Sequence, residues 1–437
     1  MKSFFRSSLA LRPMLCAALS AAAFPSFAES GPPLAFPSAE GFGARATGGR
    51  GGEIYHVTHL GDSGPGSFRE GVGKGPRMVI FDVGGYVELK AIVSVASDIT
   101  ILGQSAPGEG IGIRNYEVSF SKSHNVIVRY LRFRMGLTPK MEKKCAVGLT
   151  EGSNMIFDHA SIQFGRWDCI GLSKSRDVTF QNCIIGPGID PQRFGCLCES
   201  DNVTFSHNLW ISNQSRNPKS KGVVQYVNNV VYNWGVCGYV GGHSAGEHSA
   251  VVQGNYFIKG PGSNEHFAGE FAPTDHLHQS GNFMDMDRDG QLNGRLATAG
   301  DFGTGPDAPT LEDATTILPP VPVRLDSAEA AYKKVVASAG CSLHHDAVDT
   351  RLIADLTSLG RQGATIKNPD EMGGFGEIKG GPLPAGAERD GIPDGWKRAH
   401  GLNPMEANAA KADSIKAGST NLESYLNELV GDLPAKK

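Results

Sequence analysis

The sequence predicts an all-β protein, a right-handed parallel β-helix with short helical decoration towards its C-terminus. Three observations predict this fold class: a strand-like run that recurs along the chain, a composition rich in glycine, and helical patterning confined to the C-terminal part. Glycine accounts for 57 of the 437 residues, and charged residues make up 20%. Both values depart from average usage in the direction expected of a strand-and-turn protein.

The recurring run extends from about residue 97 to about residue 260. Each run alternates β-branched or apolar residues with polar ones, and most begin with Asp or Asn. The runs are 98–103, 125–130, 154–159, 177–182, 202–207, 223–228 and 250–255. Successive runs start roughly 21 to 29 residues apart, which is the spacing expected of a solenoid with one set of strands per coil.

Asparagine follows many of these runs and precedes a second apolar triplet, as at Asn182, Asn208, Asn229 and Asn255. Asparagine tolerates the left-handed backbone conformation and can hydrogen-bond a neighbour one coil away, so we expect stacked asparagines at a corner of the coil. No helical pattern long enough for a crossover separates the runs, which argues against a doubly wound sheet.

The N-terminal residues 1–28 are typical of a secretory signal peptide. Lys2 and Arg6 supply the positive end, Leu9 to Ala23 the apolar run, and Ser26 to Ala28 a cleavage box. No later stretch is long and apolar enough to span a bilayer. We therefore predict a secreted protein, extracellular or periplasmic.

The rest of the chain divides by pattern into three parts. Residues 29–300 contain the β-helix, and 301–367 a Pro- and Gly-rich surface linker followed by a helical segment that packs on the solenoid. Residues 368–437 form a C-terminal tail. The net charge of −4 gives no reason to expect a nucleic-acid partner, and we expect a monomer without membrane contact. Cleavage leaves an odd number of cysteines, which we interpret as structural.

The segment Ser215 to Lys221 (SRNPKSK) lies between two strand-like runs. An arginine before a rigid proline turn, with a second cation five residues on, suits an acidic polymer. Arg216 can neutralise a carboxylate of such a polymer. Taken alone, the segment is more often a solvated basic loop, so its interpretation depends on the rest of the chain.

With Arg216 in place, the chain resembles the extracellular pectate lyases of polysaccharide lyase family 1, in the branch that opens with an AFPxAEGFG segment and carries an RNPKxK motif. The matching segments are 35–43, 48–52, 55–58, 62–67, 101–108, 129–134, 157–159, 229–234 and 389–396. The resemblance covers nearly the whole mature chain. It implies cleavage of polygalacturonate or pectin by β-elimination to 4,5-unsaturated oligogalacturonides, with pectic polysaccharide as the partner and calcium as the cofactor.

The resemblance also implies roles for three residues. Arg216 occupies the position of the proposed catalytic arginine, although arginine normally stays protonated. It could act as the base or mainly stabilise charge. Lys221 is expected to hold a neighbouring carboxylate. Arg193, on the preceding coil, occupies about the position of a substrate-binding lysine.

The calcium cluster is where the sequence departs from the family. Relatives carry an aspartate thirteen residues before the DH of their FDH motif, but here Cys145 stands there, beside Lys143 and Lys144. The acidic pair of relatives is reduced to Trp167 and Asp168. Loss of two oxygen ligands should weaken a calcium site.

Two interpretations of this departure stay open. Lys143 or Lys144 supplies the positive charge directly, with Trp167 and Asp168 contacting the sugar, or the chain is a weakly active or non-catalytic pectin-binding protein. Trp167 could equally be simple packing in the groove wall.

A second calcium signal is separate from the groove. The stretch from Asp285 to Asn293 matches an EF-hand-type loop, with Asp285, Asp287, Asp289 and Gln291 as candidate ligands. Leu296 replaces the usual final glutamate, so the predicted affinity is reduced. The alternative is an acidic turn without metal. The tail around Asp390 is a degenerate calcium-type motif for which we predict no metal.

Two rival functions follow from the same patterns. A β-helical hydrolase would need paired carboxylates, for which Asp190 and Asp201 are candidates. A carbohydrate-binding β-helix would need no catalytic group. The products separate the three: unsaturated ends, saturated reducing ends, or none.

Overall fold

A computed structural model describes Met1, residues 32–412 and residues 418–433. The chain divides into two units, Met1–Pro32 and Pro33–Lys437, and every element named below belongs to the second. Apart from Met1, the predicted signal peptide lies outside the described residues. Among the helices of the described ranges, none is long and apolar enough to cross a membrane.

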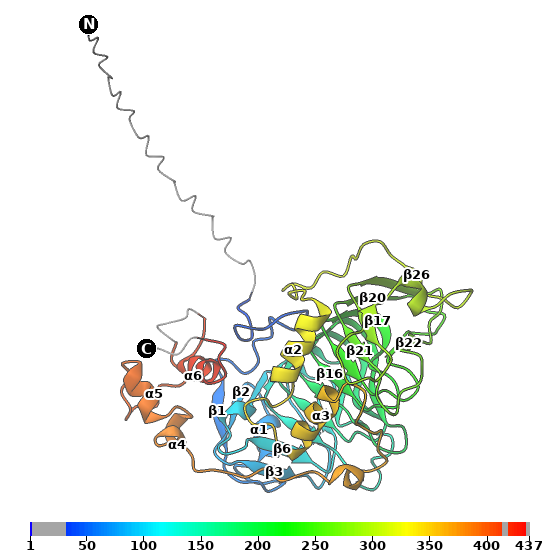
Figure 1. The fold of residues 1–437 in the computed structure, drawn as a ribbon. Coiled ribbons are helices and arrows are strands. Elements are labelled where there is room, and N and C mark those ends of the chain that lie inside the picture. Colours follow the sequence, from blue (N-terminus) through cyan, green and yellow to red (C-terminus); the bar gives the residue numbers. More distant parts are fainter. Residues whose placement is uncertain (2–31, 413–417, 434–437) are drawn as a thin grey trace. The chain divides into compact units, whose positions relative to one another are not determined.

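The larger of two β-sheets forms one side of the solenoid (Figure 1). Its strands are, in spatial order, β1 (Glu53–Val57), β2 (Arg77–Phe81), β5 (Ile99–Leu102), β8 (His124–Arg129), β11 (Ser153–Asp158), β13 (Asp168–Gln181), β15 (Phe194–Ser206), β17 (Lys219–Val227), β20 (His248–Gln253), β23 (Asp275–Ser280) and β26 (Thr310–Leu311). All of these neighbours pair in parallel.

The second sheet contains β3 (Gly85–Glu88), β6 (Ile111–Arg114), β9 (Arg132–Arg134), β12 (Ser161–Gln163), β14 (Ile184–Ile185), β16 (Leu209–Ile211), β18 (Val230–Tyr232), β21 (Tyr256–Ile258), β24 (Phe283–Asp285) and β25 (Arg295–Leu296). The last pair, β24 with β25, is antiparallel. In both sheets spatial order follows chain order, so each coil stacks on the one before it. The predicted parallel β-helix is confirmed.

A third face is made by short strands that join the larger sheet. Strands β4 (Val93–Ser94), β7 (Val118–Ser119) and β10 (Val147–Thr150) pair in that order and meet the first half of β13. Strands β19 (Tyr239–Val240) and β22 (Ala268–Gly269) continue this face beyond β17. The pairing of β13 with β15 shifts register between Ser173 and Arg176, an irregularity that bends a strand. The first halves of the long strands therefore belong to this third face.

The core holds a stack of aromatic rings, one from each successive coil. The rings of Phe157 and Phe180 lie 4.5 Å apart between centroids, and those of Phe180 and Phe205 lie 5.7 Å apart. Parallel pairing in register places Phe157, Phe180, Phe205 and Tyr226 opposite one another on neighbouring strands. The stack arises because identical positions of successive coils face the same interior.

A ladder of buried asparagines marks one corner of the coil. Asn208 Nδ2 donates to Asn229 Oδ1 at 3.0 Å, Asn229 to Asn255 at 3.1 Å, and Asn255 to Asn282 at 2.9 Å. We expected asparagine at this corner to take the left-handed conformation, and Asn182 does so with φ 53°. On the next coil His207, with φ 55°, makes the left-handed turn and the ladder residue Asn208 follows it.

Two helices, α2 (Ala328–Ser338) and α3 (Ala347–Thr357), pack on the second sheet. Val335, Leu352 and Leu356 share a buried cluster with Leu209 and Val230 of that sheet. The remaining helical elements are α1 (Phe68–Val72), α4 (Ala387–Asp390), α5 (Asp394–Ala399), α6 (Asn421–Leu429) and the 3₁₀ turns η1 (Gly103–Ser105), η2 (Ala299–Phe302) and η3 (Pro369–Met372).

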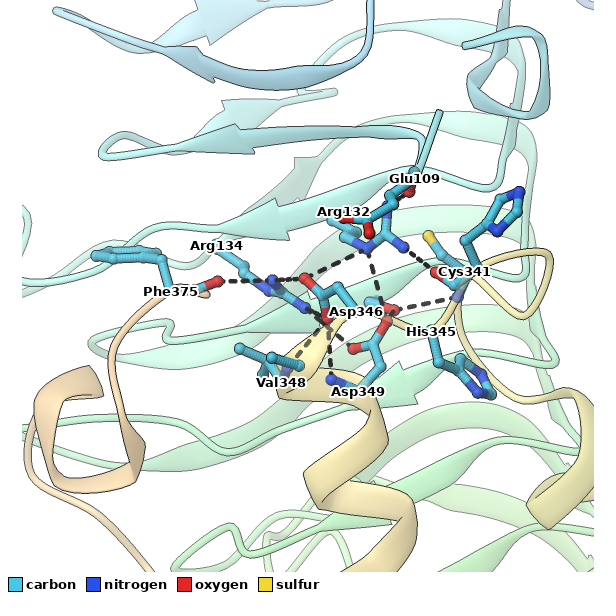
Figure 2. A network of polar contacts seen from close by, with 12 residues as sticks. Glu109, Arg132, Arg134, Cys341, His345, Asp346, Val348, Asp349 and Phe375 are labelled. Atoms are coloured by element: carbon cyan, nitrogen blue, oxygen red, sulfur yellow. Dashed lines mark hydrogen bonds and ion pairs between the residues drawn. The ribbon is translucent and has the colours of Figure 1, made fainter. Parts of the chain in front are cut away.

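A buried polar network attaches α3 to the solenoid (Figure 2). Arg134 Nη2 donates to Asp346 Oδ1 at 2.9 Å and to Asp349 Oδ1 at 3.1 Å. Asp346 is also the N-cap of α3 and accepts two backbone N–H groups. Arg132 Nε lies 3.7 Å from each of the two carboxylates. Burial would raise the pKa of Asp346, but Arg134 and Arg132 more than offset this, and the pKa is lowered.

The C-terminal helices cover the first coils. Leu422 and Leu426 of α6 share a buried cluster with Met78 and Ile80. Within the tail motif, Asp390 pairs with Lys397 at 2.8 Å, and both side chains are buried. The Asp390 carboxylate is therefore engaged in holding the tail together.

Candidate active site

The third face of the solenoid brings together the groove residues proposed from sequence. Lys143, Trp167 and Asp168 line one hollow of about 280 Å³. Arg216 contacts Asp168, and Lys221 lies on β17, the strand that follows Arg216 in the chain. Arg193 directly precedes β15. Residues from four successive coils thus meet on one surface because the coils stack in register.

Arg216 lies in the turn between β16 and β17 with φ 62°. Its carbonyl accepts the N–H of Cys196 at 2.7 Å, which fixes the backbone. Its Nη1 lies 3.2 Å from Asp168 Oδ2 and 3.4 Å from Oδ1. The guanidinium carbon lies 4.2 Å from the centre of the Phe194 ring. The side chain keeps 21% of its surface exposed and so stays open to the groove.

Asp168 is fully buried at the first position of β13. Burial raises the pKa of its carboxyl to about 7, with Glu199 adding to the rise and Arg216 opposing it. Loss of hydration disfavours the charged form more than one contact with Arg216 restores it. Asp168 is therefore a carboxyl group that can gain or lose a proton near neutral pH.

Two lysines project from β17 beside Arg216. Lys221 Nζ lies 3.0 Å from Glu199 Oε1, and Lys219 Nζ lies 3.1 Å from Glu270 Oε2. Sequence analysis missed Lys219, Glu199 and Glu270. The period of two in a strand places Lys219 on the same face as Lys221, and that signal could have found it.

The hollow beyond Asp168 carries the substitutions that set this chain apart. Trp167 N–H donates to the carbonyl of Lys144 at 3.0 Å, so the tryptophan is tied to the lysine segment. Lys144 Nζ lies 3.6 Å from Glu117 Oε1, with 43% of the lysine side chain exposed. Cys145 is half-buried, and its backbone N–H donates to Glu117 at 3.3 Å.

Arg193 contacts a carboxylate of its own turn, with Nε 3.2 Å from Asp190 Oδ1. Its carbonyl accepts the N–H of Gln214 at 2.6 Å, which links it to the turn that carries Arg216. Asp190 was one carboxylate of the rival hydrolase pair, and here it is engaged by Arg193.

The carboxylates of this groove do not fit a calcium ion. Glu117 faces Lys144, Asp168 faces Arg216, and Glu199 faces Lys221. Calcium takes about six to eight oxygen ligands, and its site needs several free carboxylates together. Across residues 32–412 and 418–433, no group of three or more His, Cys, Asp or Glu side chains is arranged to hold a metal ion.

The EF-hand-type loop lies after β24, where its carboxylates hydrogen-bond the loop backbone. Asp287 Oδ1 accepts the N–H of Asp289 at 3.0 Å, and Asp289 Oδ1 accepts that of Gln291 at 2.7 Å. Asp285 is buried, and burial raises its pKa. The described loop does not bring three acidic groups into a metal-binding arrangement. Calcium binding here stays a prediction from sequence.

The parallel β-helix and its groove of arginine and lysine side chains occur here in a chain whose curated relatives define its class, the polysaccharide lyases. A probable pectate lyase C of Aspergillus flavus is 41% identical over 400 residues, covering 91% of this chain and 94% of the relative. One of Emericella nidulans is 40% identical over 401 residues, covering 91% and 93%. The chain belongs to the pectate lyase family, as the sequence motifs had indicated.

Solved structures agree at the level of the fold. The pectate lyase of Paenibacillus sp. 0602 superposes with a TM-score of 0.52 at 13% identity, covering 72% of this chain and 98% of that one. A thermostable pectate lyase gives the same TM-score of 0.52 at 14% identity, covering 70% and 98%. No protein-family model matches the chain.

Proposed function

We propose that this protein is a secreted pectate lyase that cleaves polygalacturonate or pectin by β-elimination, with Arg216 as its catalytic residue. The contact of Arg216 with the buried Asp168, in a groove that also presents Lys221, is the observation that carries the proposal. The secreted location rests on the predicted signal peptide, residues 1–28.

The reaction needs positive charge beside the carboxylate of the reacting uronate. The C5–H bond breaks, a C4=C5 double bond forms, and the C4–O4 bond breaks, with the leaving oxygen taking a proton from water. Negative charge develops on the carboxylate as C5 loses its proton, and fixed cations stabilise that charge. Arg216 and Lys221 supply this charge, and Lys143 and Lys144 extend the cationic surface along the groove.

A guanidinium normally stays protonated and is therefore a poor base. The contact with Asp168 gives Arg216 a group to which it can transfer a proton. Nη1 of Arg216 can pass a proton to Asp168 as another guanidinium nitrogen takes the proton from C5. The elevated pKa of Asp168, about 7 against an ordinary 3.8, makes this transfer easier. No step is assigned to calcium, because the groove carboxylates already face cations.

The test measures the formation of ultraviolet-absorbing product. The substrates are polygalacturonate and methylated pectin, each assayed with added calcium and with chelator. Arg216→Ala and Arg216→Lys are compared with Arg176→Ala, a control at an arginine whose side chain is 73% exposed. Polymer binding is followed by affinity electrophoresis. We expect chelator-insensitive product with the wild-type and control proteins, and none with Arg216→Ala.

Three other outcomes correct the proposal. Activity that requires calcium would show that the groove carboxylates rearrange around a metal. Saturated reducing ends would indicate hydrolysis. Polymer binding without product would make this a pectin-binding protein on a lyase scaffold, the alternative suggested by Cys145 and Trp167.

A further inference from the structure

The guanidinium of Arg216 is contacted on two sides. Both oxygens of Asp168 approach the same nitrogen, Nη1, at 3.2 and 3.4 Å. This is not the forked contact in which two guanidinium nitrogens meet two carboxylate oxygens. A contact through one nitrogen leaves the plane of the guanidinium free to turn. The Phe194 ring, 4.2 Å from the guanidinium carbon, supplies the missing constraint.

The backbone fixes the ring and the arginine relative to each other. Phe194 begins β15 and forms a β-bridge with Ser215, the residue before Arg216. Gly195 N–H donates to the Ser215 carbonyl at 3.0 Å, and Cys196 N–H to that of Arg216 at 2.7 Å. These backbone hydrogen bonds therefore hold the two side chains in one register.

Packing does not account for Phe194. It is half-buried, and it belongs to none of the hydrophobic clusters found among the described residues. Within the same residues its ring pairs with no other aromatic ring, and its aromatic contact is the Arg216 guanidinium. A phenylalanine at a strand start that packs on a cation instead of the core points to a role through that cation.

We propose that Phe194 is the positioning residue of Arg216, a role that rests on the proposed function of that arginine. The ring face attracts the guanidinium and limits its rotation, with Nη1 directed at Asp168. Without the ring, Arg216 still binds uronate but spends less time in the reactive orientation. The effect therefore falls on turnover and not on binding.

The test compares Phe194→Leu, Phe194→Tyr and the wild type in steady-state lyase assays. Phe283→Leu, on the second sheet, is the matched control. We expect Phe194→Leu to lower kcat roughly 2- to 30-fold, the range a cation–π contact provides. KM should stay within about twofold, and Phe194→Tyr, which keeps the ring face, should restore kcat. Circular dichroism melting of each variant checks that it folds.

Three results would contradict the proposed role of Phe194. A raised KM with unchanged kcat in Phe194→Leu would show that the ring contacts the sugar instead of Arg216. Equal kcat and KM in all variants would remove any role for the ring. If the wild type forms no unsaturated product, the proposed function fails while the contact itself is still tested by NMR. The Arg216 δ-protons, assigned with Arg216→Lys, should lose an upfield ring-current shift in Phe194→Leu, and an unchanged shift would refute the contact.

Discussion

Two sets of arginine–aspartate contacts in this molecule use the same groups in opposite ways. Behind the second sheet, Asp349 accepts hydrogen bonds from Arg134, Ser161 and Gln163, and Asp346 from Arg134 and two backbone N–H groups. In the groove, Asp168 hydrogen-bonds through its side chain to Arg216 alone among the described residues. The pKa of Asp346 is lowered, whereas that of Asp168 is raised to about 7. A carboxylate with many hydrogen-bond partners stays ionised and stabilises the fold. A buried carboxyl group with few partners can gain or lose a proton near neutral pH.

The largest effect is expected from breaking the buried network. Arg134→Ala leaves two buried carboxylates short of their cation, so we expect the free energy of unfolding to fall by about 3–5 kcal/mol. Urea denaturation measures this, with Arg351→Ala on α3 as the control. A loss below about 1 kcal/mol would mean that water or Arg132 compensates and that the two regions differ less than their contacts indicate.

The second prediction concerns the stability of the groove. The folded-state pKa of Asp168 lies above its ordinary value, so the carboxyl favours the folded state below pH 4 and this contribution is lost as pH rises through 7. Asp168→Asn removes that titration. Relative to wild type, the variant should gain stability between about pH 4 and 7, reaching about 1–3 kcal/mol and then staying constant. Urea midpoints at pH 4, 6 and 8 test this, and a variant destabilised at pH 8 would contradict it.

The third prediction gives the activity of the same variant. Ionised Asp168 holds Arg216 and can take its proton, so kcat should rise with pH around 7 in the wild type. Asp168→Asn should lower kcat by about 10- to 100-fold and flatten this rise. A pH profile of kcat from pH 5 to 9 measures both. A variant that keeps the wild-type profile would exclude Asp168 from the proton transfer.

The smallest effect is expected at the exposed end of the groove. Lys144 pairs with Glu117 while 43% of its side chain is exposed, so Lys144→Met should change stability by less than about 1 kcal/mol. Removing a cation that faces substrate should raise KM for polygalacturonate about threefold, and less for methylated pectin. Lys333→Met on α2 is the control. Equal KM changes for both polymers would show that Lys144 does not interact with the carboxylates of the substrate.

The fold could be predicted from sequence because a solenoid repeats one local pattern. Each strand-like run, such as 177–182 or 202–207, stacks on the next run. Equivalent positions of successive runs therefore lie side by side in the structure. The groove was harder to predict. Arg216 was found through its motif, but Phe194 contacts Arg216, and Glu199 pairs with Lys221, from the preceding coil. Coil lengths vary, so the sequence does not give the register that pairs Glu199 with Lys221.

The loop after β24 shows a second limit of sequence patterns. The alternation of aspartates from Asp285 indicates a cation site, which stays a prediction, and the structure adds that Asp287 and Asp289 each accept a backbone N–H from within the loop. A pattern of residue types does not report which backbone groups compete for the same oxygens.

The asparagine ladder at Asn208, Asn229, Asn255 and Asn282 limits how the solenoid can be lengthened. Only the addition of whole coils preserves it. Each rung bonds the same position of the next coil, over separations of 21, 26 and 27 residues. Duplication of a whole coil would restore the ladder, whereas an insertion of a few residues within a run would break it. Each added coil lengthens the groove by one strand spacing, about 4.8 Å. The length of polymer that the groove can contact is therefore set by the number of coils and changes only by whole coils.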